Sequence, residues 1–68
     1  MRIYQFLETF SDADAIGYHV MGIDKLIRDQ GFETGIFANN IDEKCIGLAK
    51  HFKSFEFDDE ENVILFHH

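Results

Sequence analysis

The stretch ETFSDADAIGYHVMGIDKLIRDQGFETGIFANN, residues 8–40, decides the fold of this 68-residue chain. Its middle part carries apolar residues at helical spacing, namely Ile16, Val20, Ile23 and Ile27, with Leu26 beside them. Charged residues fall between them, so the pattern predicts an amphipathic helix of about four turns, starting near Asp14. Gly31 follows where a glycine in the left-handed conformation is expected to end the helix.

Strands are expected before and after this helix. RIYQFLE (2–8) begins with β-branched and aromatic residues and predicts a strand that is largely covered on both faces. FETGIFA (32–38) predicts a second strand, in which Gly35 is a weak point or a close backbone contact. NVILFHH (62–68) predicts a third strand, because it contains an uninterrupted apolar run.

The segment between the second and third strands predicts another helix. In IDEKCIGLAKHF (41–52), helical spacing recurs at Ile41, Cys45, Leu48 and Phe52, although Gly47 weakens this prediction. KSFEF (53–57) is expected to be a short edge strand or a loop.

The resulting order is strand, helix, strand, helix, strand. This alternation predicts an α/β fold: the β-α-β-α-β start of a Rossmann-like, doubly wound parallel sheet, an incomplete three-layer sandwich, spanning residues 1–68 as one fragment. In such sheets ligands bind beyond the carboxyl ends of the strands. Two candidate places lie there: the loop Thr9–Gly17, and the histidines at the end of the third strand.

Size and composition limit what the chain can do alone. A domain of 68 residues buries only about 60% of its unfolded surface, and one cysteine, Cys45, allows no internal disulfide. Cys45 is expected in the core, and a lone cysteine suits the cytoplasm. Eight phenylalanines demand more core than so short a chain encloses, so we expect the chain to self-associate or to be part of a longer protein.

The charge balance excludes some classes of partner. A formal net charge of −7 argues against binding nucleic acid or an anionic membrane through a broad basic surface. The acidic run EFDDEEN (56–62) lacks the glycine of a calcium loop and is expected to be solvated. No stretch approaches the ~20 apolar residues of a membrane span.

The loop before the first helix is expected to cap that helix. Ser11 and Asp14 have the spacing of a capping box, and Asp12 and Asp14 suit capping better than they suit a divalent metal, so no metal site is expected. The loop has neither the glycines of a dinucleotide fingerprint nor a Walker lysine, so no such cofactor is expected. His67 and His68 alternate faces, which leaves one to point into a cleft; a tag remnant is the other interpretation.

These features together resemble the amino-terminal start of bacterial glycosyltransferases with the GT-B fold, of the large retaining family 4 type. The strand, the Ser/Asp/Ala loop, the Ile-Asp-x-x-Leu helix, the Gly-Phe-Glu-Thr segment and the final ILFHH carry the resemblance. The matching positions are Ser11, Asp14, Ala15, Ile16, Val20, Ile23, Asp24, Leu26, Gly31, Phe32, Glu33, Thr34, Ala38, Ile41 and Asp42. Ala13 departs from the pattern, since the family commonly has a glycine there.

The resemblance implies that the chain is the acceptor-side beginning of an enzyme that transfers a sugar from a nucleotide-sugar to a saccharide or glycolipid. It implies no other cofactor and no activity for this fragment alone. The strand-end geometry places Asp14, Ala15, Ile16, Gly17 and His67 along a cleft, and the resemblance identifies that cleft as the one between the two domains. The catalytic residues stay open. Two alternatives from other classes are a non-catalytic α/β module that self-associates and binds a protein, and a Rossmann-like small-molecule binder unrelated to sugar transfer.

Overall fold

The computed structural model describes residues 1–11, 15–56 and 61–67. Within them, the strands β1 (Arg2–Phe10), β2 (Glu33–Ile41), β3 (Lys50–His51) and β4 (Asn62–Phe66) form one sheet in the order β3-β2-β1-β4. Every neighbouring pair is parallel. The chain is therefore a mixed α/β unit with a parallel sheet, and the Rossmann-like fold class predicted from the sequence is confirmed.

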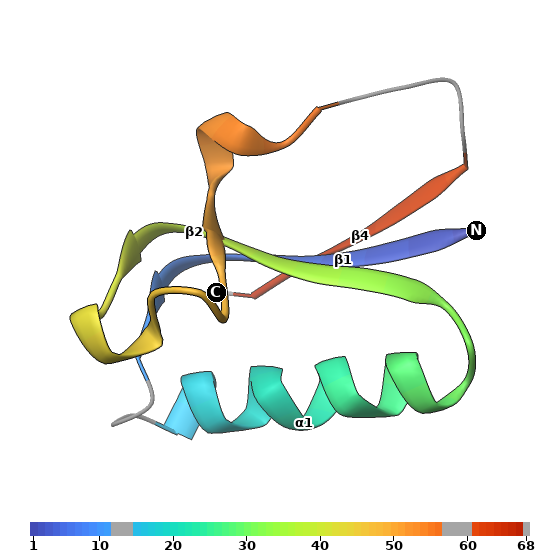
Figure 1. Ribbon diagram of the computed structural model, residues 1–68, viewed down its shortest axis with the longest axis horizontal. Coiled ribbons are helices and arrows are strands. Elements are labelled where there is room, and N and C mark those ends of the chain that lie inside the picture. The colour runs from blue at the N-terminus through green and yellow to red at the C-terminus, as the bar shows by residue number, and fades with distance from the viewer. Residues whose placement is uncertain (12–14, 57–60, 68) are drawn as a thin grey trace.

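One α-helix, α1 (Ala15–Asp29), connects β1 to β2 and lies along one face of the sheet (Figure 1). The chain after β3 passes to the opposite face before it returns as β4 (Figure 1). Among the described residues, Phe52, in the 3₁₀ turn η2 (Phe52–Ser54), and Phe55 pack against Phe6 on that opposite face.

The end of α1 confirms the prediction for Gly31. Its φ is +87°, its N–H donates to Arg28 O at 2.9 Å, and Phe32 N–H donates to Ile27 O at 3.3 Å. This pair of bonds is the Schellman arrangement, which satisfies carbonyls that the helix end would otherwise leave without partners. Asp24 and Arg28, one turn apart on α1, form an ion pair at 2.8 Å.

The buried side of α1 differs from the expected stripe. Gly17, Val20 and Ile27 are buried, whereas Ile16 is 46% and Leu26 64% exposed. The helix therefore packs through a narrower stripe that includes a glycine.

The predicted helix over 41–52 is wrong. The structure has a 3₁₀ turn, η1 (Glu43–Cys45), followed by the short edge strand β3. Ile46 is extended at ψ 127° and Gly47 has φ +99°, a conformation that an α-helix does not contain. Cys45 is buried in the core as predicted, but Leu48 points outward, so the helical spacing is coincidental. In 53–57, the described residues form a turn and a loop; residue 57 lies outside the described part.

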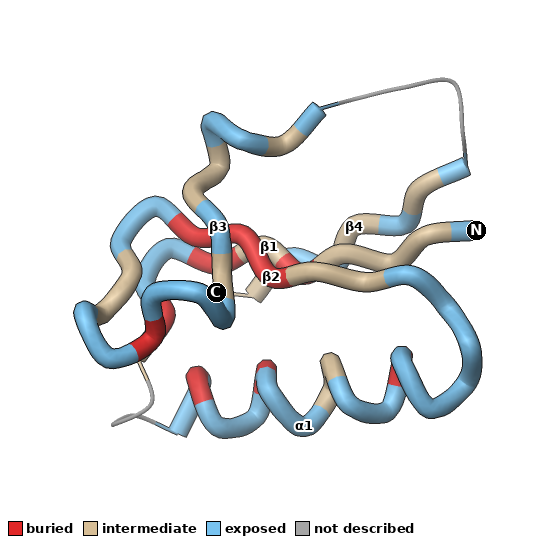
Figure 2. The backbone as a smooth tube through the Cα atoms, in the orientation of Figure 1, coloured by how far each residue is buried: buried red, intermediate tan, exposed pale blue. Residues whose placement is uncertain are grey.

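The core has two parts with different chemistry. Between the sheet and α1, where buried residues gather in Figure 2, lies a mainly aliphatic cluster: Leu7, Phe10, Val20, Ile36, Ala38 and Cys45. The other face carries an aromatic cluster: Tyr4, Phe6, Phe37, Phe52, Phe55 and Phe66, with ring centroids 5.1–5.7 Å apart. The alternation of strand side chains thus separates the two parts.

Candidate functional site

The order of the strands creates a topological switch point beside β1. β2 and β3 lie on one side of β1 and β4 lies on the other, and their connections run over opposite faces of the sheet (Figure 1). In open parallel sheets this arrangement leaves a crevice at the carboxyl ends of the two strands that flank the switch. The carboxyl ends of β1 and β4 are therefore where a ligand is expected.

A pocket of about 490 Å³ occupies that place. β4 makes its last pair through Phe66, opposite Phe6, while β1 continues to Phe10, so the end of β1 forms an open edge among the described residues. The pocket is lined by Phe6, Leu7, Glu8, Thr9, Ile16, Phe52, Phe66 and His67. We call it the switch-point pocket.

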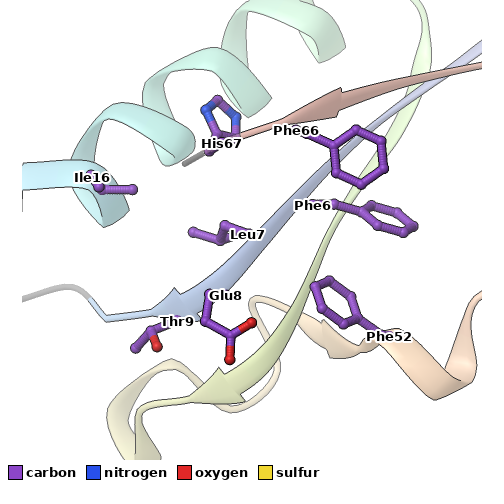
Figure 3. A pocket seen from close by; sticks show the side chains of 8 residues that line it. All are labelled: Phe6, Leu7, Glu8, Thr9, Ile16, Phe52, Phe66 and His67. Atoms are coloured by element: carbon purple, nitrogen blue, oxygen red, sulfur yellow. The ribbon is translucent and has the colours of Figure 1, made fainter.

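One side of the switch-point pocket is aromatic. Figure 3 shows Phe66, Phe6 and Phe52 in a row along it. The rings of Phe6 and Phe52 stack at 5.3 Å with 25° between their planes, and Phe66 meets Phe6 edge-on at 5.5 Å. Phe66 is 65% exposed, so its ring is available for contact with a ligand.

Polar groups lie near these rings. Glu8 and Thr9 are consecutive exposed residues of β1, although alternation would bury one of them. Asn39 and Asn40 on β2 are exposed at the same level, and the Asn39 amide donates to the Glu8 carboxylate at 2.9 Å. Both strands therefore change phase here, which leaves Glu8 and Thr9 at the pocket.

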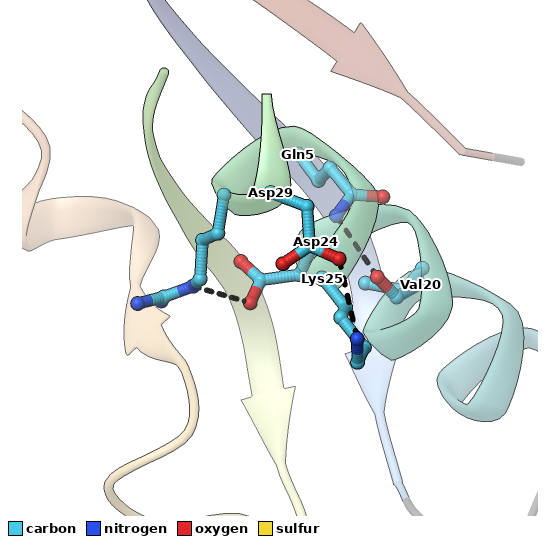
Figure 4. A network of polar contacts seen from close by, with 6 residues as sticks. Gln5, Val20, Asp24, Lys25 and Asp29 are labelled. Carbon is cyan, nitrogen blue, oxygen red and sulfur yellow. Dashed lines mark hydrogen bonds and ion pairs between the residues drawn. The ribbon is translucent and has the colours of Figure 1, made fainter. Parts of the chain in front are cut away.

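His67 is tied to the sheet and to α1 through Gln5. The Gln5 side chain is fully buried, and its Nε2 donates to Val20 O at 3.0 Å, as Figure 4 shows. A backbone carbonyl only accepts hydrogen bonds, so this bond fixes the amide and turns Oε1 toward His67 Nε2 at 2.9 Å. Oε1 also only accepts, and His67 Nε2 must therefore carry the proton.

The strand-to-helix loop is attached to the end of β2. The Ser11 hydroxyl donates to the Asp42 carboxylate at 3.0 Å, and the backbone N–H of Lys44 donates to the same carboxylate at 3.1 Å. The hydrogen bond from Lys44, and to a smaller extent that from Ser11, holds the pKa of Asp42 below its ordinary value of 3.8. Ser11 thus bonds to Asp42 across the sheet edge; the predicted capping role of Asp14 lies outside the described residues.

The structure brings together three of the five site residues expected from the sequence. Ala15, Ile16 and His67 line a second pocket of about 380 Å³ with His19, and Ile16 and His67 also line the switch-point pocket. Gly17 is buried within α1, and Asp14 lies outside the described residues.

Sequence reasoning missed Gln5, Glu8 and the aromatic side of the pocket. Gln5 carries a signal, because a polar residue in the middle of a buried apolar strand needs partners. Phe52 carries none, since its place depends on the path of the chain after β3.

The described part of the chain shows no metal site and no membrane-spanning helix. Within residues 1–11, 15–56 and 61–67, no group of three His, Cys, Asp or Glu side chains is arranged to hold a metal ion. The Asp12–Asp14 pair lies outside these residues. No helix in the described part of the chain is long and apolar enough to cross a bilayer.

Comparison with known proteins gives no match: no protein-family model, curated protein or solved structure resembles the chain significantly.

Proposed function

We propose that this chain is the amino-terminal, acceptor-side part of a cytoplasmic glycosyltransferase of the GT-B fold, and that the switch-point pocket binds a saccharide. The observation that carries the proposal is the pocket itself. It combines three aromatic rings, of which that of Phe66 is exposed, with hydrogen-bonding side chains at the place where α/β sheets bind ligands. The sequence resemblance over the loop, α1 and the end of β4 supports the same enzyme class.

Saccharides suit this combination of groups. A sugar ring has an apolar face of C–H groups that can lie against an aromatic ring, and Phe66 presents such a ring. Its hydroxyl groups need acceptors and donors at the rim, and the Glu8 carboxylate and the Thr9 hydroxyl are side chains of these kinds. Pockets of about 300–1,000 Å³ hold small ligands, and this one lies within that range.

The nucleotide-sugar donor is assigned to a second domain. A pyrophosphate needs basic side chains or a glycine-rich helix start, and the described residues that line the switch-point pocket include neither lysine nor arginine. The net charge of −7 also disfavours binding of a pyrophosphate. The 68 residues therefore supply the acceptor side of a cleft and are not active alone.

Sugar transfer by the full-length protein tests the proposal. We expect the protein encoded by the complete reading frame to bind a nucleotide-sugar in calorimetry and to transfer its sugar to a saccharide acceptor. Phe66→Ala should weaken the acceptor's binding without changing the donor's. Val63→Ala, an apolar truncation at the other end of β4, should change neither. A full-length protein that binds no nucleotide-sugar would contradict the enzyme class.

The exposed side chains of the edge strand β4 favour a second candidate function, that of the self-associating module. The helix-side residues of β4, Val63 and Leu65, are 38% and 37% exposed, and β4 is an edge strand of the described sheet. Exposed apolar edges promote strand pairing between chains. If this candidate is right, sedimentation equilibrium at micromolar concentration should show a dimer, and Leu65→Lys should dissociate it. A compact monomer would contradict self-association.

A further inference from the structure

We infer that the switch-point pocket selects a neutral or amine-bearing sugar and discriminates against an anionic one, such as a uronic acid. This inference rests on the proposed saccharide role of the pocket and adds the charge of its ligand. Three observations carry it: the charge of Glu8, the bonding of His67, and the aromatic side of the pocket.

Glu8 places a negative charge at the pocket without a neighbouring cation. Its carboxylate accepts a hydrogen bond from Asn39, which is neutral, and it forms no ion pair among the described residues. A carboxylate accepts hydrogen bonds from sugar hydroxyl or ammonium groups, whereas it repels a second carboxylate.

The rest of the lining does not compensate for this charge. Among the described residues that line the pocket, His67 is the only ionisable one besides Glu8. Its Nε2–H is already directed to Gln5 Oε1, 2.9 Å away, and is therefore not directed at a ligand. An anionic sugar would lack the lysine or arginine that usually binds carboxylate and phosphate groups.

The aromatic side of the pocket also disfavours an anionic sugar. The face of a phenylalanine ring carries partial negative charge, so it attracts ammonium groups and polarised C–H groups and does not attract anions. Phe6, Phe52 and Phe66 lie together on this side of the pocket (Figure 3). An amine-bearing sugar would meet these rings and the Glu8 carboxylate together.

The amino terminus of α1 is the one feature that would favour an anion. Ile16 in its first turn lines the pocket, and the helix dipole places partial positive charge there. That partial charge is about half an elementary charge, which is less than the full negative charge of the Glu8 carboxylate. The charge of Glu8, with no lysine or arginine among the described lining residues, therefore sets the preference.

The test compares three methyl glycosides that differ in one substituent: the glucoside, the 2-amino-2-deoxyglucoside and the glucuronide. Their affinities for the chain are measured by NMR titration at low salt. We expect the glucuronide to bind at least about fivefold more weakly than the glucoside, since like charges about 4 Å apart in water repel by this much. The aminoglucoside should bind at least as tightly as the glucoside, and added salt should reduce the differences.

Two matched variants assign the effect to its residue. Glu8→Gln should bring the glucoside-to-glucuronide affinity ratio close to one. Glu61→Gln makes the same chemical change at the opposite end of the sheet, next to the start of β4, and should leave the ratio unchanged. Glu8 is exposed, so circular dichroism should show both variants folded.

Each outcome has a distinct meaning. Equal or tighter binding of the glucuronide overturns the inference while leaving a saccharide site in place, and so does a ratio that Glu8→Gln does not change. Binding of none of the three glycosides overturns the saccharide site itself, and with it the inference.

Discussion

Replacing Gln5 with leucine should cost stability and free the His67 ring at the same time. Leucine is close in size to glutamine, so the change removes two hydrogen bonds, at 3.0 and 2.9 Å, without leaving a large cavity. Neutral hydrogen bonds contribute about 0.5–1.5 kcal/mol each, and burying the more apolar leucine offsets part of the loss. We expect a net destabilisation of about 1–2 kcal/mol.

Two measurements test this prediction. For a domain of this size the loss should lower the Tm by roughly 5–15 °C, measured by circular dichroism. In ¹⁵N NMR spectra at neutral pH, the His67 ring should be held as the Nε2–H tautomer in the wild type and become a mixture of tautomers in Gln5→Leu. Gln30→Leu makes the same substitution at an exposed position and should change stability by less than about 0.5 kcal/mol.

The reasoning is refuted if Gln5→Leu matches the wild type in stability and leaves the tautomer of His67 unchanged. A stability loss without a tautomer change would show that Gln5 matters for packing and not as the bridge between α1 and His67.

Three further predictions concern stability. Gly22→Ala should stabilise the fold by about 0.5–1 kcal/mol, because Gly22 lies in the exposed interior of α1 with nothing within 4 Å of the added methyl group. Gly31→Ala should destabilise the fold by about 1–2 kcal/mol, because Gly31 has a φ of +87°. Urea unfolding that shows the same sign for both variants would contradict this. Phe10→Ala should cost about 3–5 kcal/mol, because this ring is fully buried in the helix-side core; a loss below 1 kcal/mol in the same assay would contradict that burial. The pKa of Asp42 is lowered on folding, so its charge stabilises the fold above pH 3.8 and this contribution is lost as the pH falls through the folded pKa. The difference in unfolding free energy between the wild type and Asp42→Asn should thus be constant near neutral pH and shrink in acid. Urea unfolding between pH 6 and pH 3 tests this, and a difference that stays constant over the whole range would contradict it.

The sequence predicts the first half of the fold well, because local signals there agree with one another. α1 combines a helical period, charged residues on its outer side and a glycine that ends it, and the structure has the helix with its Schellman end. The flanking strands are apolar and bounded by polar residues. In this region, tertiary packing only shifts which residues of α1 are buried.

The second half fails where a single signal stands alone. The helical spacing of Ile41, Cys45, Leu48 and Phe52 arises by coincidence, and the left-handed Gly47 interrupts any helix between them. The candidate site is hidden for a related reason. His67 is found because it ends a strand, but Phe52 reaches the pocket only through the crossing of the chain over the sheet, which no local pattern encodes.

The bridge between Gln5 and His67 joins residues that are 62 positions apart in the sequence. Most residues that line the switch-point pocket come from the same two regions, the end of β1 and the end of β4, so the pocket is incomplete until the last strand has docked. A chain in which β4 has locally detached keeps α1 and the β1–β2 pair but has no complete pocket. Any ligand of the pocket therefore binds only the docked form and slows hydrogen exchange of the β4 amides by the factor 1 + L/Kd, where L is the free ligand concentration. Protection of this one strand would then report binding more directly than the stability of the whole domain.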